Sequence, residues 1–203
     1  MCRTFFYVNQ INNCGRNMQY FLKNIAKKLV FGSILIYNYK VIRVKEEIYM
    51  VTLDKIYHAS YVLKDVVIPT PLVKATAISD DCEVYLKPEN LQITGSFKVR
   101  GSGYKISQLT EEEKKRGVIA CSAGNHAQGV ALAATKYGIK SLICLPDGAP
   151  ISKVEATKGY GAEVCMVPGV YDDAYNKACE LRDEHNYTFI HPFDDENVIA
   201  GQG

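Results

Sequence analysis

Short apolar runs alternate with helical segments through the second half of the chain, and this alternation constrains the fold most. The predicted strands are residues 118–121, 141–145, 162–167 and 188–190. The helices predicted between them run from about 125 to 137, 153 to 158 and 172 to 185. Strands separated by helices of this length predict right-handed βαβ units and a parallel sheet covered on both faces. The fold class is therefore α/β, and ligands are expected at the carboxyl ends of the strands.

Several helix boundaries can also be predicted from the sequence. Thr110 and Glu113 have the spacing of a capping box that opens a short polar helix, which Gly117 ends. Gly138 is expected just past the end of the helix that begins near residue 125. Gly159 is expected to close the helix over 153–158.

Charge is distributed unevenly, although the net charge is only +2. Residues 1–49 carry eight Lys or Arg and two Asp or Glu, and their apolar stretch 29–37 is shorter than the roughly 18 residues of a membrane span. Phe, Tyr, Met, Ile, Asn and Lys dominate this segment, as in translated AT-rich non-coding DNA. We expect 1–49 to be a non-homologous basic extension without function, with the true start at Met50. The small net charge predicts no nucleic-acid partner, and we expect no membrane partner.

The seven cysteines argue against two classes of site. Their number is odd and no two have C-x-x-C spacing, so neither a disulfide framework nor a zinc site is indicated. The other side chains show no spacing for a metal site either. Buried, reduced thiols in a cytoplasmic protein are the better interpretation.

Lys98 is the first candidate for chemistry. Phe97 precedes it, and Gly95, Gly101 and Gly103 flank it. Glycines let the backbone approach a ligand closely, and an aromatic side chain can pack on a planar cofactor. A partly desolvated lysine loses its proton readily and becomes a nucleophile able to form a Schiff base. A solvated surface lysine is the alternative.

The turn over residues 122–129, with the sequence SAGNHAQG, is the second candidate. A helix N-terminus offers free N–H groups and a positive dipole end, which together bind a carboxylate or phosphate. A phosphate-binding P-loop is excluded, because Val130 and Ala131 stand where it needs Lys and Ser or Thr.

Local sequence leaves a simpler interpretation of this turn open. It could be an ordinary strand-to-helix connection in which Asn125 caps the helix and His126 lies at the surface. The remaining histidines are interpreted as structural: His58, His185 and His191.

Seven short motifs occur in order along the chain. They are PTPL at 69–72, KPEN at 87–90, GSFKVRG at 95–101, CSAGNHAQG at 121–129, APISKV at 149–154, and PFDD at 192–195 with IAGQG at 199–203. Together they resemble the N-terminal part of the threonine dehydratases (threonine ammonia-lyases). These are fold-type II pyridoxal-phosphate (PLP) enzymes related to the tryptophan synthase β subunit. The resemblance covers roughly residues 50–203.

The resemblance implies PLP as cofactor and a role for each motif residue. Lys98 would hold the cofactor as a Schiff base and later act as the base at Cα. Phe97 would lie against the cofactor ring, and Asn125 would bond the ring's 3′-oxygen. The substrate carboxylate would be bound by Ser122, Ala123, Gly124, Asn125 and His126. The implied reaction is deamination of L-threonine or L-serine to a 2-oxo acid and ammonia.

Ala123 discriminates among the relatives. Similar serine racemases carry a second serine there, which serves the second face of the substrate carbon. A methyl group carries no exchangeable proton, and elimination needs only the Lys98 face. The resemblance therefore favours a deaminase over a racemase.

The resemblance also implies a domain layout. Residues 50–109 would begin a large cofactor-binding domain, 110–197 would form a small α/β domain, and 198–203 would start the return into the large domain. Family members continue past this point into a glycine-rich loop that binds the cofactor phosphate, and they form homo-oligomers. Two hypotheses follow: an incomplete copy of a dehydratase, or a non-catalytic remnant. We expect the 203-residue chain by itself to be inactive.

Overall fold

The computed structural model describes residues 3–7, 51–77 and 83–203. By their internal contacts the residues divide into two units, 1–49 with 70–89 and 50–69 with 90–203. The layout implied by the resemblance, with boundaries after 109 and 197, stays a prediction. The expectation of a functionless extension concerns residues that, apart from 3–7, lie outside the described part. Cys2, Cys14 and Cys82 also lie outside it.

The first unit contains a small mixed sheet in the order β1-β3-β2. Strand β3 (Glu83–Lys87) pairs in parallel with β1 (Arg3–Tyr7) and antiparallel with β2 (Val73–Lys74). Lys87 Nζ donates to the Thr70 carbonyl at 2.7 Å, and Thr70 Oγ1 donates to the fully buried Glu89 carboxylate at 2.5 Å. These bonds join the PTPL and KPEN motifs.

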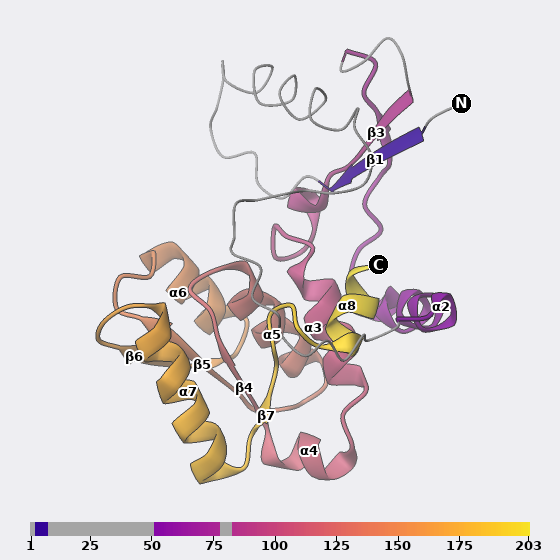
Figure 1. Ribbon diagram of the computed structural model, residues 1–203. Coiled ribbons are helices and arrows are strands. Elements are labelled where there is room, and N and C mark those ends of the chain that lie inside the picture. The colour runs from indigo at the N-terminus through magenta and orange to yellow at the C-terminus, as the bar shows by residue number, and fades with distance from the viewer. Residues whose placement is uncertain (1–2, 8–50, 78–82) are drawn as a thin grey trace, which may run out of the picture. The chain divides into compact units, whose positions relative to one another are not determined.

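The second unit is built on a four-stranded parallel sheet in the order β6-β5-β4-β7 (Figure 1). Its strands are β4 (Val118–Cys121), β5 (Ser141–Pro146), β6 (Glu163–Val167) and β7 (Thr188–Phe189). All their pairings are parallel. The α/β fold class and all four predicted strands are confirmed, with ends that differ by one residue at most.

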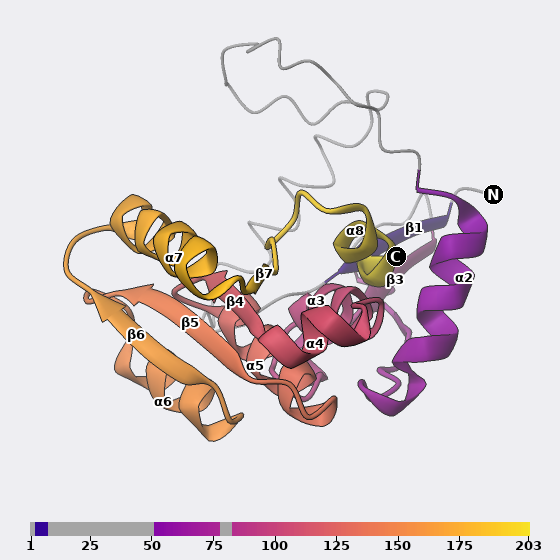
Figure 2. The same ribbon diagram turned by 90° about the horizontal axis from the view of Figure 1, so that it is seen from below.

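Helices cover both faces of this sheet (Figure 2). Helices α5 (Asn125–Lys136) and α6 (Ile151–Gly159) lie on one face, and α7 (Tyr171–His185) lies on the other. Strand residues alternate between the two layers, so β4 is buried at every position, as expected for a covered parallel sheet. The prediction of a sheet covered on both faces is confirmed.

The layer under α7 contains the buried thiols. Cys121 and Cys144 are opposite each other in the β4–β5 register and pack against Ala174 and Ala178 of α7. Burial raises the pKa of Cys121 to about 11 and that of Cys144 to about 12, so both thiols stay protonated at neutral pH. They are free, as are the half-buried Cys165 and Cys179.

A group of helices completes the second unit beside the sheet. It comprises α2 (Leu53–Val62), α3 (Lys98–Ser107), α4 (Glu111–Arg116), α8 (Glu196–Gln202) and a 3₁₀ helix at Leu63–Asp65. A second 3₁₀ helix, Glu89–Leu91, begins at the last residue of the first unit. Helix α3 packs against both α5 and α8. Around α3, a cluster of buried apolar residues is formed by Ala59, Leu63, Val66, Val99, Tyr104 and Ala200.

Two glycines of the Lys98 motif serve this packing and were wrongly interpreted from sequence. Gly101 and Gly103 lie inside α3 rather than in a loop that approaches a ligand. A Cβ on Gly101 would lie 2.9 Å from the Val198 carbonyl oxygen of α8, and one on Gly103 would lie 3.0 Å from Leu63. Their missing side chains let helices approach α3 closely.

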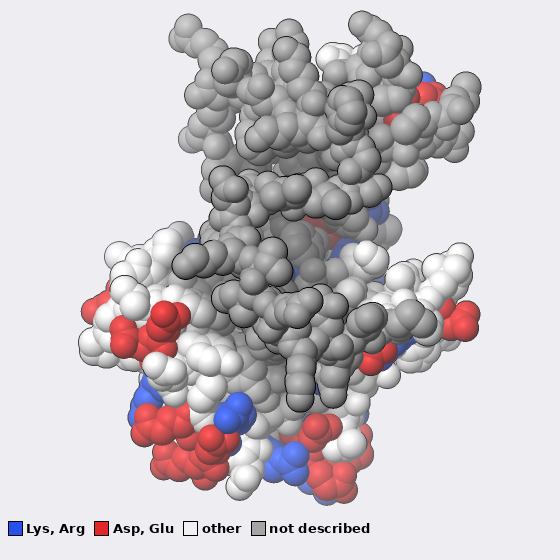
Figure 3. All heavy atoms as spheres, in the orientation of Figure 1, with Lys and Arg blue, Asp and Glu red and all other residues white. Residues whose placement is uncertain are grey.

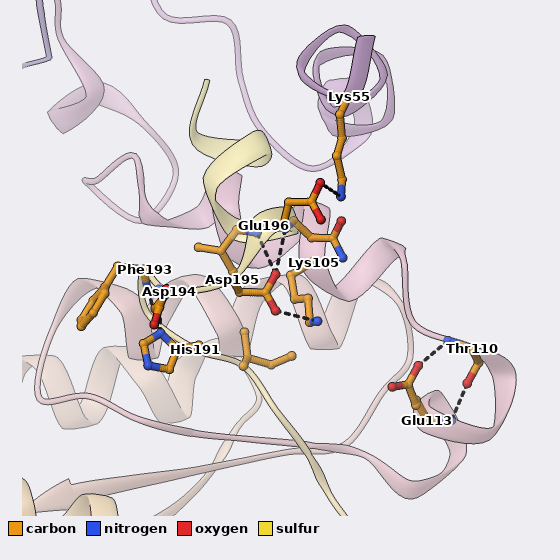
Figure 4. A network of polar contacts seen from close by, with 12 residues as sticks. Lys55, Lys105, Thr110, Glu113, His191, Phe193, Asp194, Asp195 and Glu196 are labelled. Carbon is orange, nitrogen blue, oxygen red and sulfur yellow. Dashed lines mark hydrogen bonds and ion pairs between the residues drawn. The ribbon is translucent and has the colours of Figure 1, made fainter. Parts of the chain in front are cut away.

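The helix boundaries largely follow the sequence signals. The Thr110 hydroxyl accepts from the Glu113 N–H at 3.2 Å, and the Glu113 carboxylate accepts from the Thr110 N–H at 2.8 Å (Figure 4). Gly117 caps α4, and Gly138 follows the C-cap of α5 with φ 67°. The expectation for Gly159 is wrong: it is the last residue of α6, and the left-handed residue that ends the turn is Gly161.

Acidic and basic side chains of the described residues lie intermixed on the face shown in Figure 3. Helix α4 carries both kinds of charge, with three glutamates in its first turn and three basic residues in its last turn. None of the helices in the described residues is both long and apolar enough to cross a bilayer.

Candidate active site

Lys98 is the first residue of α3 and stands at the end of a tight turn. Gly95 adopts φ 66°, a left-handed conformation that favours glycine, and its N–H donates to the Gln92 carbonyl at 2.7 Å. The fully buried Ser96 accepts the Lys98 N–H on its hydroxyl at 3.3 Å. The turn therefore fixes the point at which the Lys98 side chain leaves the backbone.

The Lys98 amine is half-buried and points toward the segment that follows β7. Its Nζ donates to the Pro192 carbonyl oxygen at 2.7 Å and lies 5.3 Å from the centre of the Phe97 ring. Burial lowers the pKa of Lys98 from its usual value. The amine therefore loses its proton more readily than a surface lysine does, as the sequence predicted.

The turn after β4 leads directly into α5. The Ser122 N–H donates to the Cys144 carbonyl at 3.2 Å, and the Ser122 hydroxyl accepts from the Gly124 N–H at 3.2 Å. A Cβ on Gly124 would meet no atom of the described residues within 4 Å, so these residues leave the space beside Gly124 open. Free N–H groups at a helix start beside open space are suited to an anion.

Asn125 does not cap α5, so the capping interpretation from sequence is wrong. Gly124 is the N-cap residue and Asn125 is the first residue of the helix. The Asn125 side chain is engaged elsewhere, because its Oδ1 accepts from Lys153 Nζ at 3.0 Å.

His126 is buried, which corrects the expectation of a surface histidine; it is 4% exposed. A carbonyl oxygen only accepts, so Nε2 carries the proton and donates to the Ile190 carbonyl at 2.9 Å. Burial, with a smaller contribution from the Lys98 charge, lowers the pKa of His126 to about 4. His126 is therefore neutral at pH 7, with a buried Nδ1 that has no partner in the described residues.

Close packing between α3 and α5 brings the two motifs together. A Cβ on Gly129 would lie 3.1 Å from the Lys98 carbonyl carbon and 2.8 Å from Ser102 Oγ. Burial is the main cause of the lowered pKa of both His126 and His191, and the Lys98 charge adds a smaller contribution to each. Residues about 25 positions apart in sequence thus form one site at the carboxyl end of β4.

The segment from Ile190 to Glu196 closes the other side of this site, and sequence reasoning gave it no role. Besides the carbonyls of Ile190 and Pro192, it contributes Asp195, which caps α8 and pairs with Lys105 of α3 at 2.7 Å (Figure 4). Burial alone would raise the pKa of Asp195, but Lys105 and two backbone N–H groups outweigh it and hold the pKa below its usual value. The PFDD motif at 192–195 was the sequence feature that could have indicated a role for this segment.

The motifs and their arrangement match a known family. The family model described as pyridoxal-phosphate dependent enzyme matches residues 63–203. The chain belongs to this family. Pyridoxal phosphate is the cofactor of the family, as the resemblance implied.

Individual relatives point in the same direction. L-threonine ammonia-lyase of Thermotoga maritima is 50% identical over 156 residues, which cover 76% of this chain and 39% of that protein. The structure of threonine deaminase isoform 2 from Solanum lycopersicum has a TM-score of 0.67 and 36% identity, over 74% of this chain and 46% of that one. The structure of maize serine racemase has a TM-score of 0.69 and 33% identity, over 73% of this chain and 46% of that one. The chain therefore spans less than half the length of these relatives.

The residues present fit the reactive end of the family's cofactor. Lys98 supplies an amine of lowered pKa, and Phe97 supplies an aromatic ring beside it. The open space before Gly124 and the unpartnered Nδ1 of buried His126 leave room and polar capacity for a bound group. In the part of the chain that the structure describes, no cluster of three or more His, Cys, Asp or Glu could hold a metal ion.

Proposed function

We propose that this protein is a PLP-dependent ammonia-lyase that deaminates L-threonine or L-serine. The observation that carries the proposal is the Lys98 amine, half-buried with a pKa lowered by burial, at the start of a helix that packs directly against α5. Relatives of this chain are described as L-threonine ammonia-lyase and threonine deaminase.

In this proposal Lys98 has two tasks. Its amine would hold the cofactor, and as a free amine it would take up the Cα proton of the substrate. The lowered pKa serves both tasks, because each needs the neutral amine. PLP, when bound, supplies the electron sink that makes the Cα proton acidic. Phe97, whose ring lies beside the Lys98 amine, would pack against the cofactor ring.

The turn before α5 orients the substrate. Backbone N–H groups of Asn125 and His126 bind the substrate carboxylate at the helix start. Because the His126 ring is neutral and bonded to Ile190, His126 acts through its backbone rather than through a positive charge. Ser122 holds the Gly124 N–H and so shapes the loop, with Ala123 between them.

The overall reaction balances without an oxidant. The amino acid loses its Cα proton and its β-hydroxyl as water, and hydrolysis consumes one water and releases ammonia. The products are ammonia and a 2-oxo acid.

Release of 2-oxo acid tests this function. The chain with saturating PLP is given L-threonine or L-serine, and the 2-oxo acid is followed by reduction with lactate dehydrogenase. The proposal predicts product from the wild type and from Lys177→Ala, a partly exposed lysine on α7, and none from Lys98→Ala, whereas an inactive fragment would give no product at all. No product from the wild type with either substrate would contradict the proposal and favour a non-catalytic α/β module.

A serine racemase is the second candidate, because the maize enzyme is among the structural relatives. Ala123 argues against it, since its methyl group has no proton to deliver to the second substrate face. We expect deamination to exceed racemisation greatly in the wild type, and Ala123→Ser to raise D-serine formation. Chiral chromatography of L-serine incubations measures both. Equal rates in the wild type would refute the argument from Ala123.

The proposal also covers the cellular location and the oligomeric state of the protein. Four free thiols in the described residues support a cytoplasmic location. A homo-oligomer is proposed by analogy with the family.

A further inference from the structure

Lys153 lies beside the amide that is predicted to contact the cofactor. It stands in the first turn of α6, and its Nζ donates to Oδ1 of Asn125 at 3.0 Å. The side chain is partly buried. Within the described residues it has no carboxylate partner, unlike Lys158 of the same helix, which pairs with Glu155 at 3.0 Å.

Helix stability does not explain a cation at this position. The N-terminal end of a helix carries a partial positive charge, which disfavours lysine in the first turn. Lys153 is in the first turn of α6 and touches the first residue of α5, so two such ends are close to its ammonium. Its bond to Asn125 is the interaction that offsets this placement.

The chemistry of the two groups fixes which way the amide faces. An ammonium group only donates hydrogen bonds, so the Asn125 amide must present its oxygen to Lys153. The NH₂ group is then the end left for another partner. An ionised ring oxygen of pyridoxal phosphate accepts hydrogen bonds, so it requires this NH₂ end.

We infer that Lys153 is a positioning residue that holds the Asn125 amide with its NH₂ group available to the cofactor's ring oxygen. The inference rests on the proposed function, because it assigns Lys153 to the same site. Lys153 acts through Asn125 and itself touches neither cofactor nor substrate.

The first test needs no cofactor. The ¹⁵N order parameter of the Asn125 side-chain NH₂ reports how firmly the amide is held. We expect a rigid amide in the wild type, in Lys158→Met and in the donor-retaining Lys153→Arg, and a mobile one in Lys153→Met. An equally rigid amide in Lys153→Met would overturn the inference.

The second test is a double-mutant cycle on cofactor affinity. Lys153→Met should weaken PLP binding roughly five- to thirtyfold, which is the loss of affinity expected when the hydrogen bond that orients the amide is removed. In an Asn125→Ala background the same change should alter affinity by less than about twofold, because the amide is already gone. Lys153→Arg should recover most of the affinity, and Lys158→Met should leave it unchanged.

The outcomes separate the inference from the proposed function. Equal weakening by Lys153→Met in both backgrounds would overturn the positioning role, since it would mean that the charge acts directly. A wild-type chain that binds no PLP would instead contradict the proposed function, and the amide measurement would still decide on Lys153.

Discussion

His126 shows how strongly burial determines the chemistry of one side chain in this site. Its ring is bonded to the Ile190 carbonyl, and its pKa is lowered to about 4, mainly by burial. In the unfolded chain the same ring titrates near its usual pKa of about 6.5. Between these values the unfolded state binds more protons than the folded state. Stability therefore falls as the pH is lowered through this window.

A pH series of urea unfolding measures this contribution. His126 should make the wild type about 2 kcal/mol less stable at pH 5 than at pH 7. His126→Gln should remove that part of the pH dependence, whatever its effect at pH 7. Other acid-sensitive groups, such as Asp195, are common to both proteins and cancel in the difference. Parallel pH profiles for the two proteins would show that His126 is not buried in its neutral form.

Sequence could predict some of these residues and not others. Lys98 and the turn before α5 were found because glycines and an aromatic residue adjacent in sequence mark a ligand site. The burial of His126 was missed, because its partner Ile190 lies 64 residues away. The Lys153–Asn125 contact was missed for the same reason, although both motifs were recognised.

Among the elements, the contact between α3 and α5 decides where Lys98 lies. Gly129→Ala would place a methyl group 3.0 Å from the Val99 nitrogen and 3.1 Å from the Lys98 carbonyl carbon. Backbone atoms cannot move aside as a flexible side chain can. We expect a loss of about 1–3 kcal/mol in the free energy of unfolding, measured by urea titration.

Gly159→Ala is the matched control for this helix contact. Gly159 is helical and a Cβ there meets no atom within 4 Å, so alanine should be neutral or slightly stabilising. Equal stability of Gly129→Ala and the wild type would mean that α3 and α5 are not packed as described.

Helix α8 depends on Asp195, which both caps its N-terminus and pairs with Lys105. Asp195→Ala removes both interactions and should cost about 2 kcal/mol or more, while Asp195→Asn should cost less because it can still cap. Asp194→Ala, an exposed neighbour, is the control. Thermal unfolding of the three variants checks the order, and an unaffected Asp195→Ala would contradict the role of this network.

Among the helices and strands, the features predicted correctly are those that depend on residues close together in the sequence. Apolar periodicity located the four strands, and the Thr110–Glu113 capping box was read correctly because its partners are three residues apart. Gly101 and Gly103 were misinterpreted because the reason for them is α8 and the Leu63 segment, which no local pattern reveals.

For the whole molecule, membership of the family explains why a few short motifs were sufficient to recognise the site. The Lys98 motif and the α5 turn both belong to the second unit, so the reactive amine and the anion-binding helix start are positioned by one set of packed elements. The proposed chemistry rests on that shared framework.

The site of cofactor attachment tests the role of Lys98 most directly. The chain is incubated with one equivalent of PLP, treated with borohydride to make the linkage permanent, digested, and mapped by mass spectrometry. We predict a pyridoxyl group on Lys98, lost in Lys98→Ala and retained in Lys177→Ala. A label on other lysines only, or no label, would contradict it.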